Sequence, residues 1–233
     1  MNSMIPVSLT SGHADTGVSA VQRNRVLRNT YWLLALSMVP TVLGAWIGVS
    51  TGIASAMSPG LGVIVFLGGA FAFMFAIEKT KNSAAGVPVL LAFTLFMGLM
   101  LSRLVGQVLG LANGANLVML AFAGTATIFL GMASLSSLIK RDLSAMGKFL
   151  FIGAVMLLVA GIANVFIQSG ALMITLSVLA IGIFSAFILH DLKRVQDGLE
   201  TNYISATLGV YLSIYNVFQS LLALLGLASG RDE

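Results

Sequence analysis

Long apolar runs without a charged residue alternate with short polar segments along the 233-residue chain. An α-helix rises about 1.5 Å per residue and the hydrocarbon core of a bilayer is about 30 Å thick, so one crossing needs roughly 20 residues. Each run is long enough for one or two membrane-spanning helices. The charge-free runs are residues 29–77, 82–102, 104–139, 149–189 and 201–230.

Turn-forming residues divide three of these runs. The breaks fall between Ser50–Gly52 and Ser58–Gly60, at Asn113–Asn116 and at Gln168–Gly170. The first two spans could instead be one re-entrant element and one crossing, although each is long enough to cross. The pattern predicts an all-α integral membrane protein with seven spans, near 31–50, 59–77, 86–109, 117–138, 149–168, 171–189 and 203–227.

The two ends of the chain lack this pattern. Residues 1–28 are polar and mixed, without the basic-then-apolar order of a cleavable signal peptide, and are expected to form a disordered cytoplasmic tail. Residues 231–233 are expected to be a short C-terminal tail. Residues 29–230 are therefore predicted to be a single transmembrane domain.

Composition favours lipid as the surrounding solvent. Apolar residues make up 58% of the chain and charged residues 9%, with a mean hydropathy of +1.00, whereas soluble domains carry about 25% charged residues. Cysteine is absent and the two histidines, His13 and His190, are far apart, which argues against a metal site. No cofactor is expected. No basic patch with interleaved aromatic residues is present, so no nucleic-acid partner is expected either.

The basic residues predict the orientation in the membrane. Lysine and arginine are retained in cytoplasmic segments, so we expect the N-terminus in the cytoplasm and the C-terminus outside, in a bacterial-type inner membrane. Arg103 and Arg231 alone fall on the outer side of the predicted spans. The other ten of the twelve are Arg23, Arg25, Arg28, Lys79, Lys81, Lys140, Arg141, Lys148, Lys193 and Arg194.

Small residues at four-residue spacing predict close helix contacts. Lipid tails are as apolar as leucine, so apolar side chains do not drive membrane helices together. Such helices associate instead through small residues that allow close packing. We expect both series to be packing surfaces. One is Gly44, Gly48 and Gly52, and the other is Ser102, Gly106, Gly110 and Gly114.

The seventh predicted span differs from the others by a polar stripe. Unsatisfied polar groups are costly in lipid, so this helix is expected to be central and wrapped by the other six. The stripe could serve hydrogen bonding between helices or form the wall of a polar pathway. At about 100° per residue, one face carries Asn202, Ser205, Gly209, Ser213, Asn216 and Ser220.

Two charged residues lie within or at the end of predicted spans. Arg103 is expected to snorkel to the outer interface along its aliphatic stem, or else to pair within a cavity. Asp191 closes the sixth span beside His190 and just before Lys193 and Arg194. It is either an interface carboxylate paired with those bases or a gating or ion-binding carboxylate at the cytoplasmic mouth.

Patterns of catalysis give no support for an enzyme. The chain has no HExxH zinc motif, no P-loop and no pair of carboxylates in one apolar span. We therefore expect no catalytic residues.

Several segments resemble one family. A set of residues near the C-terminus is similar to the closing signature of the Bax inhibitor (TMBIM) family. The set consists of Glu200–Ile204, Ala206, Tyr211, Asn216, Leu221–Leu222 and Leu225–Gly226. The resemblance covers nearly the whole chain and implies a seven-helix fold with a central last helix. Segments similar to its bacterial YccA branch are Val26–Tyr31, Arg141–Ser144 and Gly161–Phe166.

The resemblance implies two activities. The YccA branch is known as a substrate and modulator of the membrane-bound ATP-dependent protease FtsH, which makes FtsH an implied partner. Other members are pH-sensitive calcium leak channels gated by two aspartates, one closing the sixth helix and one within the seventh. The first aspartate matches Asp191, but the second position holds Ser213, so a gate of two carboxylates sharing a proton is not reproduced.

Two hypotheses follow from the sequence. In the first, the chain binds and modulates FtsH as a slowly degraded substrate, gripped through the N-terminal tail that includes His13 and Asp15. In the second, it is a cation leak along the seventh helix, with calcium as the transported ion. The residues of that pathway or gate would be Asp191, Ser213, Asn216, Ser205 and Asn202.

Overall fold

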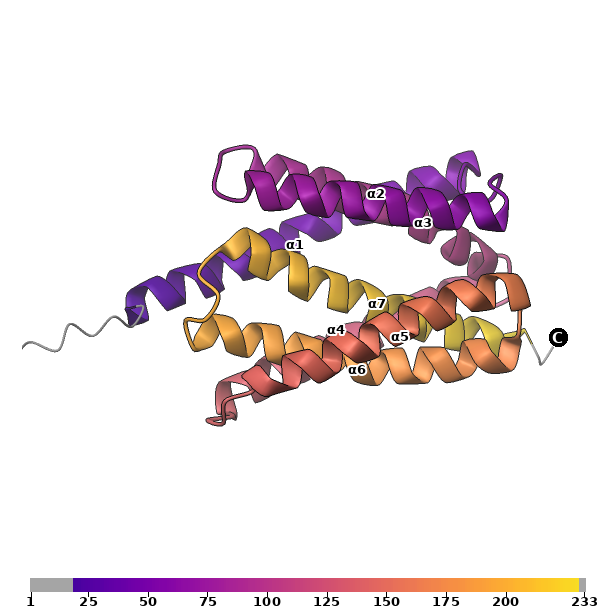
Figure 1. Cartoon of the computed structure of the whole chain (residues 1–233). Helices are drawn as coiled ribbons and strands as arrows, with labels where there is room; N and C mark the ends of the chain where they lie inside the picture. Colours follow the sequence, from indigo (N-terminus) through magenta and orange to yellow (C-terminus); the bar gives the residue numbers. More distant parts are fainter. Residues whose placement is uncertain (1–18, 231–233) are drawn as a thin grey trace, which may run out of the picture.

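A computed structural model describes residues 19–230, and over that range the chain forms seven α-helices (Figure 1). All seven are long and apolar enough to cross a bilayer, which confirms the predicted all-α membrane fold. The helices are α1 (Ala20–Thr51), α2 (Pro59–Thr80), α3 (Gly86–Leu109), α4 (Gly114–Leu138), α5 (Ser144–Ile167), α6 (Gly170–Gln196) and α7 (Tyr203–Ser229).

Capping residues lie at the helix ends on either side of the predicted breaks. Gly52 follows α1 with a φ of 68°, a left-handed conformation that glycine adopts without strain. Ser58 caps α2 immediately before Pro59. Gln168, with a φ of 54°, and Ser169 alone connect α5 to α6, as the predicted tight hairpin requires.

Four helices extend beyond their predicted spans at the end where α1 begins, and α1 and α6 extend furthest. α1 starts at Ala20, so the expectation of a disordered tail through residue 28 is wrong for residues 20–28. Val26 is buried there with Val195 and Ala206, and this tertiary contact stabilises helical turns outside the apolar run. α6 likewise continues past residue 189 to Gln196. The tail predictions for residues 1–18 and 231–233 lie outside the described residues.

α7 occupies the centre of the bundle and is the most buried of the seven spans. It contacts α1, α2, α3, α4 and α6. α5 packs on α6 and α2 but does not reach α7. The predicted central position is confirmed, whereas wrapping by all six helices is wrong because α6 separates α5 from α7.

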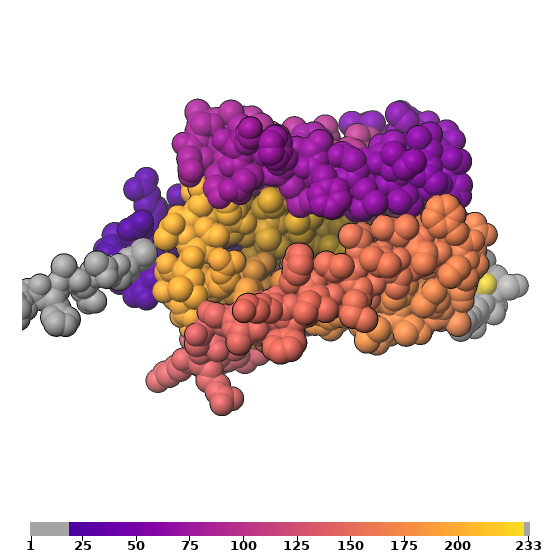
Figure 2. All heavy atoms as spheres, in the orientation of Figure 1, coloured from indigo at the N-terminus to yellow at the C-terminus, as the bar shows by residue number. Residues whose placement is uncertain are grey.

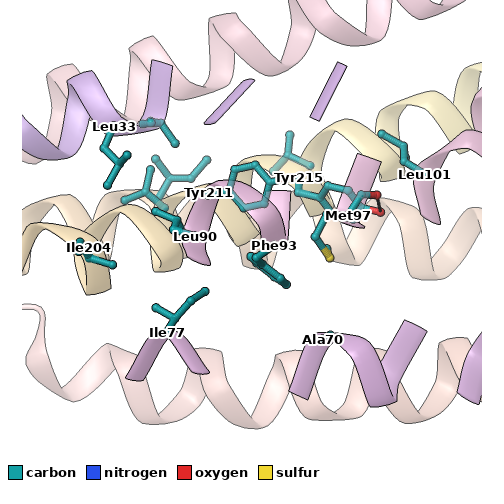
Figure 3. Packing of buried hydrophobic residues seen from close by; sticks show 14 of the residues in the cluster. Leu33, Ala70, Ile77, Leu90, Phe93, Met97, Leu101, Ile204, Tyr211 and Tyr215 are labelled. Carbon is teal, nitrogen blue, oxygen red and sulfur yellow. Dashed lines mark hydrogen bonds between the residues drawn. The ribbon is translucent and has the colours of Figure 1, made fainter. Parts of the chain in front are cut away.

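Aromatic side chains link α7 to the helices around it (Figure 3). The rings of Tyr211 and Phe93 meet edge to face, with centroids 6.1 Å apart. The Tyr211 hydroxyl lies 2.9 Å from Thr41 Oγ1, and the Tyr215 hydroxyl donates to the Met97 carbonyl at 3.3 Å. The buried phenol groups of α7 therefore find partners on α1 and α3 without water.

α1 and α3 make the most extensive helix contact in the bundle. A Cβ added at Gly44 would collide with the Leu95 carbonyl, and one added at Gly98 would collide with the Thr41 carbonyl. Gly48 faces the Ser102 side chain in the same way. The two backbones are close because three glycines remove the side chains between them.

The predicted packing series are thus confirmed only in part. Gly44, Gly48 and Ser102 lie in the contact between α1 and α3. Gly52 and Gly110 instead follow the ends of α1 and α3, where they belong to turns. Gly98 lies one four-residue step before Ser102 and so continues the second series, but the prediction did not include it.

The outer surface carries large apolar side chains that a soluble protein would bury. Trp32 is 73% exposed, Trp46 67% and Phe149 76%. Within α1 the two tryptophans lie near opposite ends of the predicted span 31–50, as expected for the aromatic belts of a bilayer. This surface is suited to lipid.

Candidate functional site

One end of the bundle collects most of its charge. The start of α1 and the α2–α3, α4–α5 and α6–α7 connections all lie at this end (Figure 1). These segments and the helix turns next to them carry the ten basic residues predicted to be cytoplasmic. We call it the basic end.

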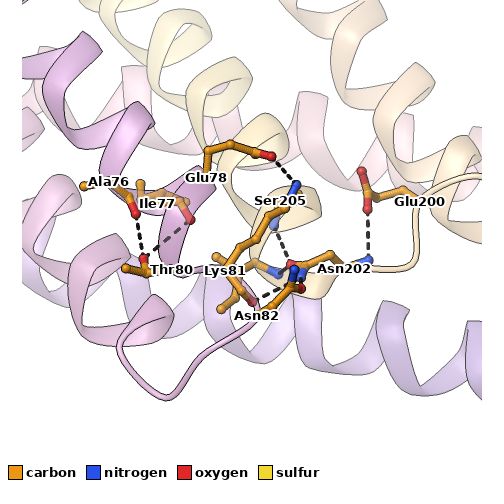
Figure 4. Close-up of polar contacts among 10 residues, drawn as sticks. Ala76, Ile77, Glu78, Thr80, Lys81, Asn82, Glu200, Asn202 and Ser205 are labelled. Carbon is orange, nitrogen blue, oxygen red and sulfur yellow. Dashed lines mark hydrogen bonds and ion pairs between the residues drawn. The ribbon is translucent and has the colours of Figure 1, made fainter.

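Asn202 organises the basic end around the start of α7 (Figure 4). Its side-chain oxygen accepts hydrogen bonds from the backbone N–H groups of Ile204 and Ser205 and so caps the helix. Its amide nitrogen donates to the Lys81 carbonyl at 3.1 Å and to Asn82 Oδ1 at 2.9 Å. Asn202, predicted as a pathway residue, therefore joins α7 to the α2–α3 connection.

Asp191 of α6 and Ser213 of α7 both contact Gly209 of α7. One Asp191 carboxylate oxygen lies 3.1 Å from His190 Nδ1, and the other lies against Gly209, where an added Cβ would be 2.8 Å away. Ser213 is 4% exposed and donates to the Gly209 carbonyl at 3.1 Å. The two positions matched to the family's aspartate pair are thus connected through Gly209.

Of the bases beside Asp191 in the sequence, His190 pairs with it and Lys193 does not. Lys193 forms its ion pair with Asp197, four residues along α6. Side chains at i and i+4 lie on the same face of a helix, whereas those at i and i+2 do not, so Asp197 takes the lysine. Among the described residues, no ion pair joins Arg194 to Asp191.

A small hollow opens beside Asp191. Its volume is about 70 Å³, enough for one or two water molecules. The described residues contain no group of three or more histidines and carboxylates placed to hold a metal ion. The hollow is lined by Asp191, Arg194, Glu200, Ser205, Ala206 and Gly209.

The polar stripe of α7 divides between two environments. Ser213 and Ser220 are buried, whereas Ser205, Gly209 and Asn216 are partly exposed. Leu212 and Gln219 are partly exposed on the same side as the latter group. Figure 2 shows α7 atoms between α2 and α5, which contact each other at one end of this opening. We call this the α7 groove, with Ser205, Gly209, Leu212, Asn216 and Gln219 as its floor.

Arg103 reaches the connection between α1 and α2. Its guanidinium donates to the Met57 carbonyl at 3.4 Å, at the end of the bundle opposite the basic end. In the part of the chain that the structure describes, it has no carboxylate partner. This geometry agrees with the predicted snorkelling and not with ion pairing in a cavity.

In the connection before α5, Asp142 makes polar contacts that shift its pKa. Asp142 accepts a hydrogen bond from the Ser144 backbone N–H at 2.8 Å. A hydrogen bond from the Ser144 side chain, together with this backbone bond, holds the pKa of the Asp142 carboxyl below its usual value. The motif Arg141–Ser144 therefore starts α5.

One hydrolase-like pattern occurs without its structural context. Gly48–Gly52 reads GxSxG, which in α/β-hydrolases presents a nucleophilic serine on a strand-to-helix turn. Ser50 instead lies in the last turn of α1, and residues 19–230 contain no strand. His13 and Asp15, predicted for protease engagement, lie outside the described residues.

Comparison with known proteins gives consistent matches over the chain. Residues 23–230 match the family model described as Inhibitor of apoptosis-promoting Bax1. An Escherichia coli protein named Modulator of FtsH protease YccA is 36% identical over 96% of this chain and 98% of its own length. In a second Escherichia coli strain, the protein with the same identity and coverage is named Inner membrane protein YccA. An uncharacterised membrane protein of Vibrio cholerae is 34% identical over 91% of this chain and 93% of its own.

Proposed function

The chain belongs to the Bax inhibitor family, and from this premise we propose that it binds and modulates the protease FtsH as a slowly degraded substrate. The related modulator suggests the partner, and the packing of α1 suggests how degradation is slowed. We place the protein in the inner membrane as a multi-pass protein.

The orientation that this role needs is supported by the basic end. A protease acting from the cytoplasm needs the N-terminal segment on its own side of the membrane. The ten basic residues lie at the end where α1 begins, and such residues are retained in the cytoplasm. We therefore propose that the segment before α1 is cytoplasmic and that the C-terminus lies outside.

The packing of α1 is the observation that carries the proposal. A protease pulling on the N-terminal segment must extract α1 first, since this helix follows it directly. α1 is held to α3 over their extensive contact, with backbone against backbone at Gly44 and Gly98. Extraction would break this contact before any other helix moves. A substrate held in this way occupies the protease while little of it is degraded.

The test uses proteoliposomes that hold FtsH, this chain and a second membrane substrate. We expect the full chain to slow degradation of the second substrate, and deletion of residues 1–18 to abolish both this inhibition and degradation of the chain. Replacing residues 1–18 with a Gly/Ser segment of equal length should retain both, because such segments are flexible coils that a protease can grip. A deletion variant that is degraded as fast as the full chain would contradict the proposal.

A second variant separates slow extraction from simple binding. Gly98→Ala places a methyl group against the Thr41 carbonyl and should loosen α1 from α3. We expect this variant to be degraded faster and to inhibit less. Inhibition that persists while degradation accelerates would show that occupancy of the protease does not explain modulation.

A cation leak is the second candidate function. It is favoured by the hollow at the basic end of α7, where Asp191 and Glu200 face Ser205. Calcium flux into liposomes holding only this chain, across a range of pH, tests it against Asp191→Asn and Ser213→Asp. Flux that is present in the parent and lost in Asp191→Asn supports a leak. Flux that appears only with Ser213→Asp means that the fold can conduct but this chain does not.

A further inference from the structure

The α7 groove exposes polar groups at the depth of the bilayer core. Asn216 is the middle residue of α7 (Tyr203–Ser229), and Gln219 lies one turn further from the basic end. Both are partly exposed to the groove. The apolar span on either side keeps these two amides away from the aqueous surfaces.

These amides are only partly satisfied within the bundle. Asn216 Nδ2 donates to the Leu212 carbonyl of its own helix at 2.8 Å, which leaves Asn216 Oδ1 free. The Gln219 amide makes no hydrogen bond to any residue in 19–230. Polar groups that face hydrocarbon without a partner are costly, so the groove favours an occupant that offers donors and acceptors.

The spacing of the groove floor fits a helix. Ser205, Gly209, Leu212, Asn216 and Gln219 repeat at intervals of four, three, four and three residues. A repeat of 3.5 residues keeps one seam of a helix facing a partner helix that runs alongside it. The bundle uses other faces of α7 for its own contacts, with Tyr211 and Tyr215 directed to α1 and α3.

Resting on the proposed modulation of the protease, we propose that a membrane-spanning helix of FtsH lies in the α7 groove, hydrogen-bonded to the amides of Asn216 and Gln219. Towards the basic end Asp191 lies against Gly209, so the partner helix contacts the groove along Leu212, Asn216 and Gln219. The groove then binds the protease within the membrane, independently of the N-terminal segment that the protease would pull.

Site-specific crosslinking tests the groove directly. The chain has no cysteine, so single cysteines can be introduced at Leu212 and Gln219, with Gln107→Cys as the control. Gln107 is an exposed residue of α3 that is not part of the groove. Each variant carries a maleimide-linked benzophenone and is reconstituted with FtsH. We expect crosslinks to FtsH from positions 212 and 219, at least fivefold above the Gln107 position.

A second measurement uses the same vesicles. The double variant Asn216→Leu/Gln219→Leu should raise the concentration needed for half-maximal inhibition of FtsH by about tenfold, because both hydrogen bonds are lost. Gln107→Leu should leave that concentration unchanged. Crosslinks confined to position 107, or inhibition unaffected by the double variant, would overturn the groove assignment while the modulator function stands.

Two other outcomes are distinguishable from these. If the wild-type chain does not slow the protease at all, the proposed function itself fails, whatever the crosslinks show. If an Asn216→Cys variant reacts with a water-soluble maleimide equally fast with and without FtsH, the groove holds water and the helix-docking proposal is overturned.

Discussion

Two sides of the bundle place small and polar residues in opposite environments. Between α1 and α3, glycines bring the backbones together, and hydroxyl groups such as Thr41 find partners inside the bundle. Along the α7 groove, Asn216 and Gln219 lie at membrane depth with unused hydrogen-bonding capacity. Small residues and polar groups are what associate helices in lipid. The first side uses them to hold the fold, and the second has them free for a partner.

The largest loss of stability is expected when a large side chain is introduced into the α1–α3 contact. Gly98→Leu forces a side chain into the Thr41 carbonyl, so we expect a loss of about 3 kcal/mol or more, or no folded protein. The control is Gly131→Leu on α4, where an added Cβ meets nothing within 4 Å. Unfolding by SDS in mixed micelles measures both. Equal stability of the two variants would contradict the close contact.

A smaller loss is expected at the cap of α7. Asn202→Ala removes the side chain that caps the helix and ties it to the α2–α3 connection, at a cost of about 1 kcal/mol for the cap. Asn82→Ala removes only one of the Asn202 contacts and should cost less. The same unfolding assay applies. If Asn82→Ala were the more harmful change, Asn202 would not be the organiser of this end.

The pair of hydroxyls between α1 and α7 should make a modest contribution to the free energy of unfolding. Tyr211→Phe removes its bond to Thr41, for an expected loss of about 0.6–1.7 kcal/mol. Thr41→Val and the double variant complete a cycle that isolates the pair. A coupling energy of zero would show that the two hydroxyls do not depend on each other.

The smallest effect on stability is expected in the α7 groove. Asn216→Leu/Gln219→Leu removes no contact between helices, so the free energy of unfolding should stay within about 0.5 kcal/mol of the parent. A loss comparable to that of Asn202→Ala would show that the groove residues hold the bundle, and the contrast between its two sides would disappear.

The sequence by itself determined the membrane fold and the number of spans. Charge-free runs of span length and turn residues such as Gln168–Gly170 act locally, so their effect can be read without a partner helix. The polar stripe likewise predicted that α7 is central. The reason behind this prediction holds only for the buried Ser213 and Ser220, because Ser205, Gly209 and Asn216 of the same stripe are partly exposed.

Only the tertiary structure decided how these helices meet. It turned residues 20–28 into helix through the contact of Val26 with Val195, placed Gly98 against Thr41, and paired Lys193 with Asp197 instead of Asp191. It also divided the polar stripe into a buried part and a groove. These outcomes depend on which faces of separate helices are in contact, and residues far apart in the chain determine that jointly. A periodic pattern within one helix carries no record of the helix that packs against it.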